Sequence, residues 1–184
     1  LLRYEPFYRH SGGGVTLSGG ECTLYPDYLE QLLRNLKKEE IHVVIETSGY
    51  FDYDSFSQKI LPYVDFIYYD IKIIDPERHK ECTRKLNDII LGNLHRLLKE
   101  SNVEVHARIP LIPGITTSFE NLSGIVEFLR EAKAPDVSLL PYNPMGIEMA
   151  TKLGKPKPLL PESFMKPDEE DRIYVMFGEL IKEK

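Results

Sequence analysis

Short apolar segments and longer amphipathic segments alternate along the chain, and this alternation is the feature that most constrains its fold. The short segments predict strands at residues 15–17, 42–46, 65–71, 103–109 and 136–140. The longer segments predict helices at residues 25–40, 53–61, 76–82, 86–100, 118–133 and 168–181. Strands and helices in this order form right-handed βαβ units around a parallel sheet. We therefore expect one α/β domain over residues 1–184.

The predicted strand at residues 103–109 has one apolar face, whereas Glu104, His106 and Arg108 share the other face. Central strands of a flat, doubly wound sheet are normally apolar on both faces. Asp70 and Lys72 also place polar side chains on one face of a strand, because residues two apart lie on the same side. A polar face favours a barrel, or part of one, with a polar interior. An edge strand that faces water is the alternative.

Polar or glycine-rich clusters follow all five predicted strands. They occupy residues 18–21, 46–49, 70–72, 108–110 and 141–143. The carboxyl ends of parallel strands meet at one rim, where barrels and open α/β sheets bind their ligands. We therefore expect these clusters to form a ligand site.

Among these clusters, the segment Ser18-Gly19-Gly20-Glu21 carries the most specific sequence signal. Two glycines after a strand let the backbone come close to a ligand. The segment is not a Walker A loop, because Gly20 stands where the lysine is needed. It also lacks the glycine spacing of a dinucleotide-binding fingerprint. A plain turn between strand and helix remains an equal alternative.

Composition and charge exclude several functional classes. The chain has 23 Lys and Arg against 29 Asp and Glu, a net charge of −6, which argues against nucleic-acid and anionic-membrane partners. No apolar run approaches the ~20 residues of a membrane span. Cys22 and Cys82 are not in a CxxC pair, so we expect no cysteine-held metal site within this chain. We expect a cytoplasmic protein.

Five motifs together resemble the glycyl-radical-enzyme activating enzymes, the pyruvate formate-lyase activase branch of the radical SAM superfamily. In order and spacing they run from about residue 8 to residue 146. They are Ser11 to Glu21, Glu46-Thr47-Ser48-Gly49, Tyr69-Asp70-Ile71-Lys72, Arg108 to Gly114, and Leu139-Leu140-Pro141-Tyr142.

The resemblance implies a partial (β/α) barrel of six units. In this family a 4Fe–4S cluster, held by a CxxxCxxC loop, binds S-adenosylmethionine. One-electron reduction cleaves the sulfonium to a 5′-deoxyadenosyl radical, which takes a hydrogen atom from a backbone glycine of a partner enzyme. The resemblance also implies a flavodoxin-type electron donor. The cofactor carries the hard step, and no general-base pair or Ser/His/Asp set stands out as catalytic.

The resemblance also assigns site residues. Gly19, Gly20 and Glu21 match the segment that binds the methionine amino group. Asp70 and Lys72 match a polar pair that contacts the methionine or the ribose.

Further matches lie on the other strand ends. Arg108 matches a position near the cofactor, where its charge suits a carboxylate. Thr47 is a further candidate for cofactor binding, and Glu46, Thr47 and Asp70 are candidate oxygen ligands for a cation. Asn143 stands where many relatives have histidine, and its amide can hydrogen-bond a ribose or a carboxylate.

The chain departs from the family pattern at its start. The CxxxCxxC loop is absent, and about five strands are present where the family has six. We expect the first βα unit, on the order of 30 residues, to precede Leu1. On this interpretation the chain is the C-terminal part of a longer protein and is inactive by itself.

Two other functional classes stay open. Lys72 at a strand end could form a Schiff base in a (β/α)-barrel lyase. The chain could also be a cofactor- or partner-binding module without catalysis. Within the activase interpretation, the partner could be pyruvate formate-lyase, a diol dehydratase or an arylacetate decarboxylase.

Overall fold

The computed structural model describes residues 4–154, 156 and 160–182. Five parallel strands form one sheet in the order of the sequence. They are β1 (Gly14–Leu17), β2 (His42–Thr47), β3 (Phe66–Asp70), β4 (Glu104–Pro110) and β5 (Asp136–Leu140). The five predicted strands and their parallel arrangement are confirmed.

Helices connect the strands. A short 3₁₀ turn, η2 (Cys22–Leu24), leads from β1 to α2 (Pro26–Lys38). The next connections contain α3 (Tyr53–Lys59) with η3 (Leu61–Tyr63), and then α4 (Pro76–Thr83) with α5 (Asp88–Glu100). The last two strands are followed by α6 (Phe119–Glu131), and by α7 (Met145–Lys152) with α8 (Pro167–Lys182).

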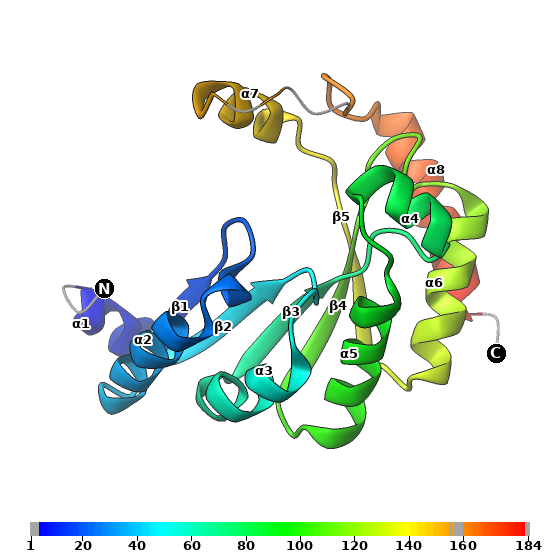
Figure 1. The fold of residues 1–184 in the computed structure, drawn as a ribbon. Helices are drawn as coiled ribbons and strands as arrows, with labels where there is room; N and C mark the ends of the chain where they lie inside the picture. The colour runs from blue at the N-terminus through cyan, green and yellow to red at the C-terminus, as the bar shows by residue number, and fades with distance from the viewer. Residues whose placement is uncertain (1–3, 155, 157–159, 183–184) are drawn as a thin grey trace.

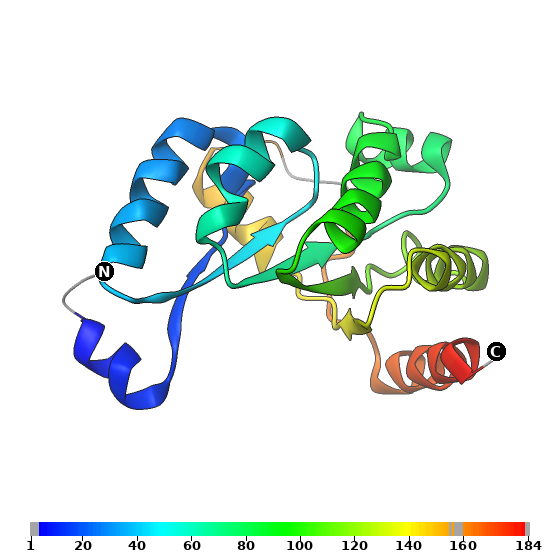
Figure 2. The same ribbon diagram turned by 90° about the horizontal axis from the view of Figure 1, so that it is seen from below.

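The sequential strand order decides between a barrel and a doubly wound sheet. In a doubly wound sheet the order reverses at a switch point and helices cover both faces. Here each crossover advances by one strand in the same direction, so that α2, α3, α5 and α6 lie on one side of a curved sheet (Figure 1 and Figure 2). The structure is therefore the partial barrel that was expected.

The core lies between the sheet and this layer of helices. Alternate strand residues such as Val43, Ile67 and Val105 are buried against helix residues such as Leu33 and Leu94. Side chains on the opposite, concave face are only half-buried and include charged groups, as the burial pattern of β4 demonstrates. Because β4 lies between β3 and β5, the alternative of a water-facing edge strand is wrong.

Helix starts follow the chemistry of the sequence. Ser118 caps α6 by accepting a hydrogen bond from the Asn121 amide, as its position predicts. Asp52 and Asp75 cap α3 and α4 in the same way. Polar capping side chains thus start these three helices after the carboxyl ends of their strands, next to the predicted ligand rim.

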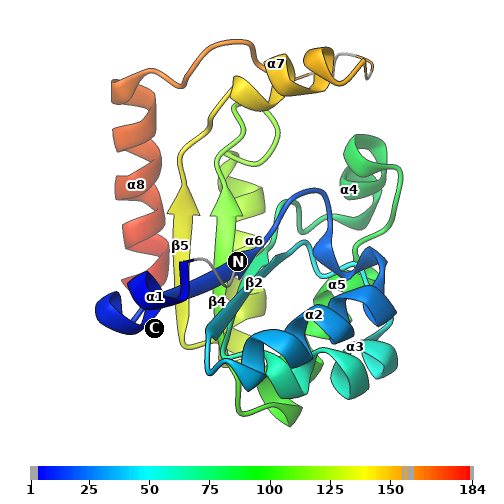
Figure 3. The same cartoon turned by 90° about the vertical axis from the view of Figure 1, so that its left-hand side faces the viewer.

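Two helices were not predicted. Helix α1 (Glu5–Ser11) precedes β1 and ends at Gly12, whose φ of 65° terminates the helix. Helix α7 follows β5 and lies beyond the carboxyl ends of the strands (Figure 3), on the side of the sheet that carries β1 and β2 (Figure 1). Both helices are short and lack the repeated leucines that mark α2. The segment at residues 155–161, which its prolines and lysines predict to be a loop, includes positions outside the described residues.

Candidate functional site

Five side chains from four strand ends form one connected group, which we call the rim cluster. The Ser18 hydroxyl donates to Glu46 Oε2 at 2.6 Å. Arg108 donates from Nη1 to Glu46 Oε1 at 2.9 Å and from Nε to Asp70 Oδ1 at 3.0 Å. Lys72 Nζ donates to Asp70 Oδ2 at 3.3 Å. Residues as far apart in sequence as Ser18 and Arg108 therefore meet at one rim.

Arg108 is the centre of the rim cluster. Its side chain is only 12% exposed, and its guanidinium carbon lies 4.5 Å from the centroid of the Tyr68 ring. Strand register explains the placement, because Asp70 and Arg108 are directly paired across β3 and β4. The guanidinium is therefore held by two carboxylates and one aromatic face.

The carboxylate of Glu46 is stabilised in its charged form. Partial burial by itself raises the pKa of Glu46, but hydrogen bonds from Ser18 and Arg108 outweigh burial and lower the pKa below 4.5. Burial lowers the pKa of Arg108, but hydrogen bonds and ion pairs with Glu46 and Asp70 outweigh burial and raise it. The site thus keeps its separate positive and negative charges at neutral pH.

Glu21 connects the glycine loop, which comprises residues 18–21, to the end of β2. Its Oε1 accepts hydrogen bonds from the hydroxyls of Thr23 and Thr47, each at 2.8 Å. Its Oε2 accepts from the Ser48 amide at 2.9 Å and from the Ser48 hydroxyl at 2.6 Å. Burial raises the pKa of Glu21, but these hydrogen bonds outweigh it and lower the pKa below 4.5. Its carboxylate therefore braces the loop from beside the rim cluster.

Because the pKa of Glu21 is lowered on folding, its stabilising effect is present above about pH 4.5 and disappears as the pH falls through the folded-state value. Glu21→Gln is expected to reduce the free energy of unfolding at pH 7 by about 2 kcal/mol, since the amide nitrogen cannot accept a hydrogen bond. Urea unfolding between pH 7 and pH 3 measures this difference, which should shrink in acid. Glu39→Gln, at an exposed position, is the control; an equal effect of both substitutions contradicts the prediction.

The glycine loop leaves open space beside the rim cluster. Gly19 has a φ of +126°, which favours glycine, and a Cβ added to Gly20 would meet no atom within 4 Å. Gly49 is different, because a Cβ there would lie 1.9 Å from the Tyr69 hydroxyl oxygen. The Gly20 position can therefore receive a ligand, whereas Gly49 is required for packing.

The expected cation site of Glu46, Thr47 and Asp70 is not assembled. Thr47 follows Glu46 on the strand and is 3% exposed, and its hydroxyl donates to Glu21. The Arg108 guanidinium lies between Glu46 and Asp70 and supplies the positive charge there. Among the described residues, no group of three or more His, Cys, Asp or Glu side chains could hold a metal ion.

Two further residues, Asn143 and Cys22, do not belong to the rim cluster. Asn143 is exposed in the segment between β5 and α7, where its Oδ1 accepts a hydrogen bond from the Met145 amide at 3.0 Å. Cys22 is half-buried, and burial next to Glu21 raises the pKa of its thiol to about 12. Cys22 is therefore a thiol at neutral pH.

Two features of the site were not predicted, namely the aromatic face of Tyr68 and the hydrogen bond from Ser18 to Glu46. The strand alternation that marks Asp70 could also have indicated Tyr68, since the two residues are on the same face of β3. Ser18 was quoted as part of a motif, but only the structure pairs its hydroxyl with Glu46.

The chain matches the Radical SAM superfamily over residues 6–129, which covers β1 to β4 and most of α6. The chain belongs to this superfamily. Its members use S-adenosylmethionine and a 4Fe–4S cluster. The chain has the superfamily's partial barrel, with the rim cluster on the edge where this cofactor is expected.

Curated relatives share the class of activity in their names. The chain is 40% identical over 147 residues to an indoleacetate decarboxylase activating enzyme from Tractidigestivibacter scatoligenes, covering 80% of this chain and 46% of the relative. It is 41% identical over 159 residues to a choline trimethylamine-lyase activating enzyme from Oleidesulfovibrio alaskensis, covering 84% and 51%. A trans-4-hydroxy-L-proline dehydratase activating enzyme from Clostridioides difficile is 38% identical over 167 residues, covering 89% and 54%. The chain spans about half the length of these relatives.

Solved structures support the fold. A domain of a pyruvate-formate lyase-activating enzyme from Bacteroides vulgatus has a TM-score of 0.70 at 23% identity, covering 92% of this chain and 95% of that domain. SuiB from Streptococcus suis has a TM-score of 0.71 at 16% identity, covering 97% of this chain and 39% of that protein. At these identities the likeness shows the partial barrel alone.

Proposed function

We propose that this chain is part of a radical SAM activating enzyme that installs a glycyl radical on a partner enzyme. The observation that carries the proposal is the rim cluster, in which Arg108 lies between Glu46 and Asp70 on the edge that also carries the open glycine loop. The names of the relatives supply the class of reaction.

The residues at the rim suit the chemical groups of S-adenosylmethionine. The cofactor has an amino group, a carboxylate, ribose hydroxyls and a sulfonium, so that it needs partners of both charges. The backbone at Gly19 and Gly20 would hold the methionine amino group, with Glu21 as the brace. Arg108 and Lys72 are cations for its carboxylate, and Asp70 can accept from a ribose hydroxyl.

When bound and reduced, the cofactor and its cluster supply a carbon radical strong enough to take a hydrogen atom from a backbone glycine. The protein's own residues orient the cofactor and keep water away from it. The partial barrel suits this task, because the rim is polar and Tyr68 provides an aromatic wall next to Arg108. No acid–base residue is required.

The Schiff-base alternative for Lys72 is not favoured. Its Nζ donates to Asp70 in an ion pair at 3.3 Å, which orients a cation and not a nucleophilic amine. The superfamily match and the relatives point to radical chemistry instead.

The proposal includes partners and a location. The partner is a glycyl radical enzyme, and the candidate panel comprises indoleacetate decarboxylase, choline trimethylamine-lyase, trans-4-hydroxy-L-proline dehydratase and pyruvate formate-lyase. A flavodoxin-type protein would supply electrons, and the cytoplasm would be the compartment. We also propose a CxxxCxxC loop upstream of residue 1. In the described part of the chain, no helix has the length and apolar character needed to cross a bilayer.

The proposal is tested with the complete protein, purified anaerobically with its iron–sulfur cluster. The expected results are reductive formation of 5′-deoxyadenosine and, with one enzyme of the candidate panel, a glycyl radical signal in electron paramagnetic resonance. Absence of 5′-deoxyadenosine from a reduced, cluster-loaded preparation contradicts radical SAM activity. Cofactor cleavage without a radical on any panel enzyme contradicts the proposed partner class.

Gly20→Val tests the position of the cofactor. A valine side chain would occupy the open space at the loop, so that the affinity for S-adenosylmethionine should fall at least about tenfold, while thermal stability changes little. Isothermal titration calorimetry on the complete protein measures the affinity. Gly178→Val places the same side chain in open space on α8 and is the control. An unchanged affinity in Gly20→Val contradicts this placement of the cofactor.

A further inference from the structure

A cavity of about 190 Å³ opens next to the rim cluster, and we call it the His79 cavity. Asp70 and Lys72 of the rim cluster form part of its wall. Apolar side chains line much of the remainder, among them Ile71, Ile73, Ile90 and Leu91. The cavity therefore borders the charged residues that suit the cofactor and extends away from them between apolar walls.

His79 is the unusual side chain of this cavity, because it is a polar residue that is only 4% exposed. Its Nδ1 lies 2.7 Å from the carbonyl oxygen of Lys85 and 3.0 Å from the Thr83 hydroxyl. A carbonyl oxygen can only accept, so that Nδ1 carries the proton and donates to it. In the neutral ring, Nε2 is then a hydrogen-bond acceptor.

The Nε2 atom is left for a ligand. Within the described part of the chain, no group hydrogen-bonds to it, and no fully buried polar side-chain atom there lacks a partner. Nε2 is therefore not fully enclosed, and the cavity is a hollow that the His79 residue lines. An unpaired acceptor beside a largely apolar cavity can take a hydrogen bond from a donor group on a ligand.

The walls around His79 are rigidly held. The Asn87 side chain, which is 3% exposed, donates to the carbonyl oxygens of Ile73 at 3.0 Å and Ile74 at 2.7 Å. The Thr83 hydroxyl donates to the His79 carbonyl oxygen at 2.8 Å. The Asn87 contacts fasten the start of α5 to the segment after β3, and the Thr83 contact lies within α4 beside the imidazole.

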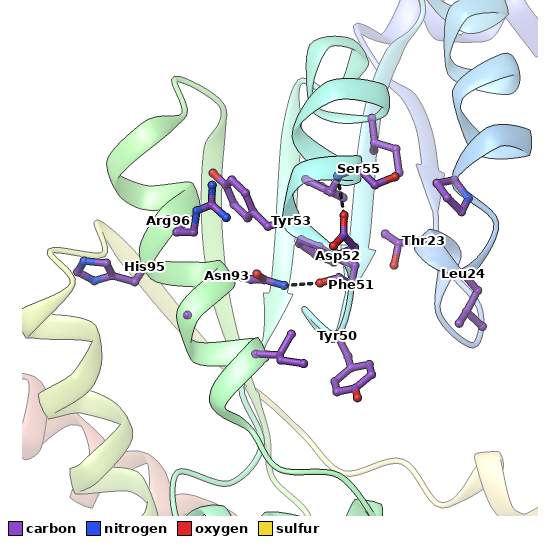
Figure 4. A pocket seen from close by; sticks show the side chains of 15 residues that line it. Thr23, Leu24, Tyr50, Phe51, Asp52, Tyr53, Ser55, Asn93, His95 and Arg96 are labelled. Atoms are coloured by element: carbon purple, nitrogen blue, oxygen red, sulfur yellow. Dashed lines mark hydrogen bonds between the residues drawn. The ribbon is translucent and has the colours of Figure 1, made fainter.

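The size of the cavity selects the ligand. Pockets for drug-sized molecules occupy about 300–1,000 Å³, so that 190 Å³ suits one or two amino-acid residues rather than a nucleoside. Tyr50 lines this cavity and also a groove of about 890 Å³ on the helical side of the sheet (Figure 4). Aromatic side chains such as Phe51 and Tyr53 form that groove, with Leu24 on one side and Arg96 on the other. A polypeptide can continue from one hollow into the next, whereas a compact small molecule cannot.

From this geometry we propose that the His79 cavity binds a short segment of the partner polypeptide close to its reactive glycine, with His79 Nε2 accepting a hydrogen bond from a backbone amide. This inference rests on the proposed function and names a substrate-binding site for it. His79 binds and positions the segment, and takes no part in the hydrogen-atom transfer.

Two substitutions of His79 separate this role from a purely structural one. The amide nitrogen of Asn reaches the place of Nδ1, so that His79→Asn keeps the contact with Lys85 and loses the acceptor. The amide oxygen of Gln reaches the place of Nε2, so that His79→Gln keeps an acceptor in the cavity. A structural histidine predicts that Asn is the better replacement, whereas a binding histidine predicts that Gln is.

The measurement is the affinity of the complete, cluster-loaded protein for fluorescein-labelled peptides centred on the reactive glycine of each enzyme in the candidate panel. Fluorescence anisotropy should show about tenfold weaker binding for His79→Asn and at most about threefold weaker binding for His79→Gln. The affinity for S-adenosylmethionine, measured in parallel, should not change. His42→Asn, an exposed histidine at the start of β2, is the control.

Three results would overturn the inference. They are unchanged peptide affinity in His79→Asn, a matching loss of affinity for S-adenosylmethionine, and failure of every panel peptide to bind the wild-type protein. The second result would assign the cavity to the cofactor. Formation of 5′-deoxyadenosine by the wild-type protein tests the proposed function separately, so that failure of the inference and failure of the function can be distinguished.

Discussion

Replacing Gly49 by alanine is expected to destabilise the protein by about 3 kcal/mol or more, from the combined cost of a strained backbone and an overfilled core. The backbone φ of Gly49 is +81°, and an added Cβ would lie 1.9 Å from the Tyr69 hydroxyl oxygen and 2.2 Å from the ring carbon that bears it. Tyr69 is fully buried and its hydroxyl donates to the Ile90 carbonyl oxygen at 2.6 Å, so that the ring cannot move away.

Urea unfolding monitored by circular dichroism measures this loss. Gly20→Ala is the matched control, because Gly20 belongs to the neighbouring glycine motif and its added Cβ would meet no atom within 4 Å. The control should lie within about 0.5 kcal/mol of the wild type. If Gly49→Ala were as stable as Gly20→Ala, the close packing of Tyr69 against this turn would be wrong.

Replacing Arg108 by methionine is expected to weaken binding of S-adenosylmethionine by about a hundredfold. The substitution keeps the unbranched stem and removes the charge, which leaves Glu46 and Asp70 without the cation between them. Truncating one member of a hydrogen-bonded charge cluster costs roughly 2–5 kcal/mol, and a hundredfold loss corresponds to about 2.7 kcal/mol. Isothermal titration calorimetry on the complete protein measures the affinity.

Two further variants separate charge from geometry at this position. Arg108→Lys keeps the positive charge, but lysine cannot contact two carboxylates at once in the same way. Its affinity for S-adenosylmethionine should therefore lie between those of the wild type and Arg108→Met. Arg34→Met removes an exposed arginine that pairs with Glu30 on α2, and should leave the affinity within about twofold. Wild-type affinity in Arg108→Met would exclude Arg108 from the cofactor site.

The regular elements were the most predictable part of the fold. The strand at residues 136–140 and the Ser118 cap were placed correctly, because apolar alternation and capping chemistry are local properties of the sequence. Helices α1 and α7 were not predicted, because short helices carry little periodicity and their stability depends on what they pack against.

The candidate site was predictable in outline. Alternation along β3 and β4 assigned Asp70 and Arg108 to polar faces, and strand register brings the two side chains together. Three contacts were not predictable. Glu21 accepts a hydrogen bond from the Ser48 amide, and the Thr47 hydroxyl donates to Glu21. Asn143 accepts a hydrogen bond from the nearby Met145 amide. Each of these depends on the partner that a side chain meets, and several partners are far away in the sequence.

The sequence alone determined that the chain forms a parallel α/β sheet with polar groups at the carboxyl ends of its strands, because periodicity and spacing are carried by neighbouring residues. Only the tertiary structure decided which of these groups pair. Glu46 and Arg108 are 62 positions apart and meet because β3 lies between their strands with a defined register. The sequence also does not indicate that His79 Nε2 lacks a hydrogen-bond partner among the described residues. Burial and the choice of hydrogen-bond partner are properties of the packed chain.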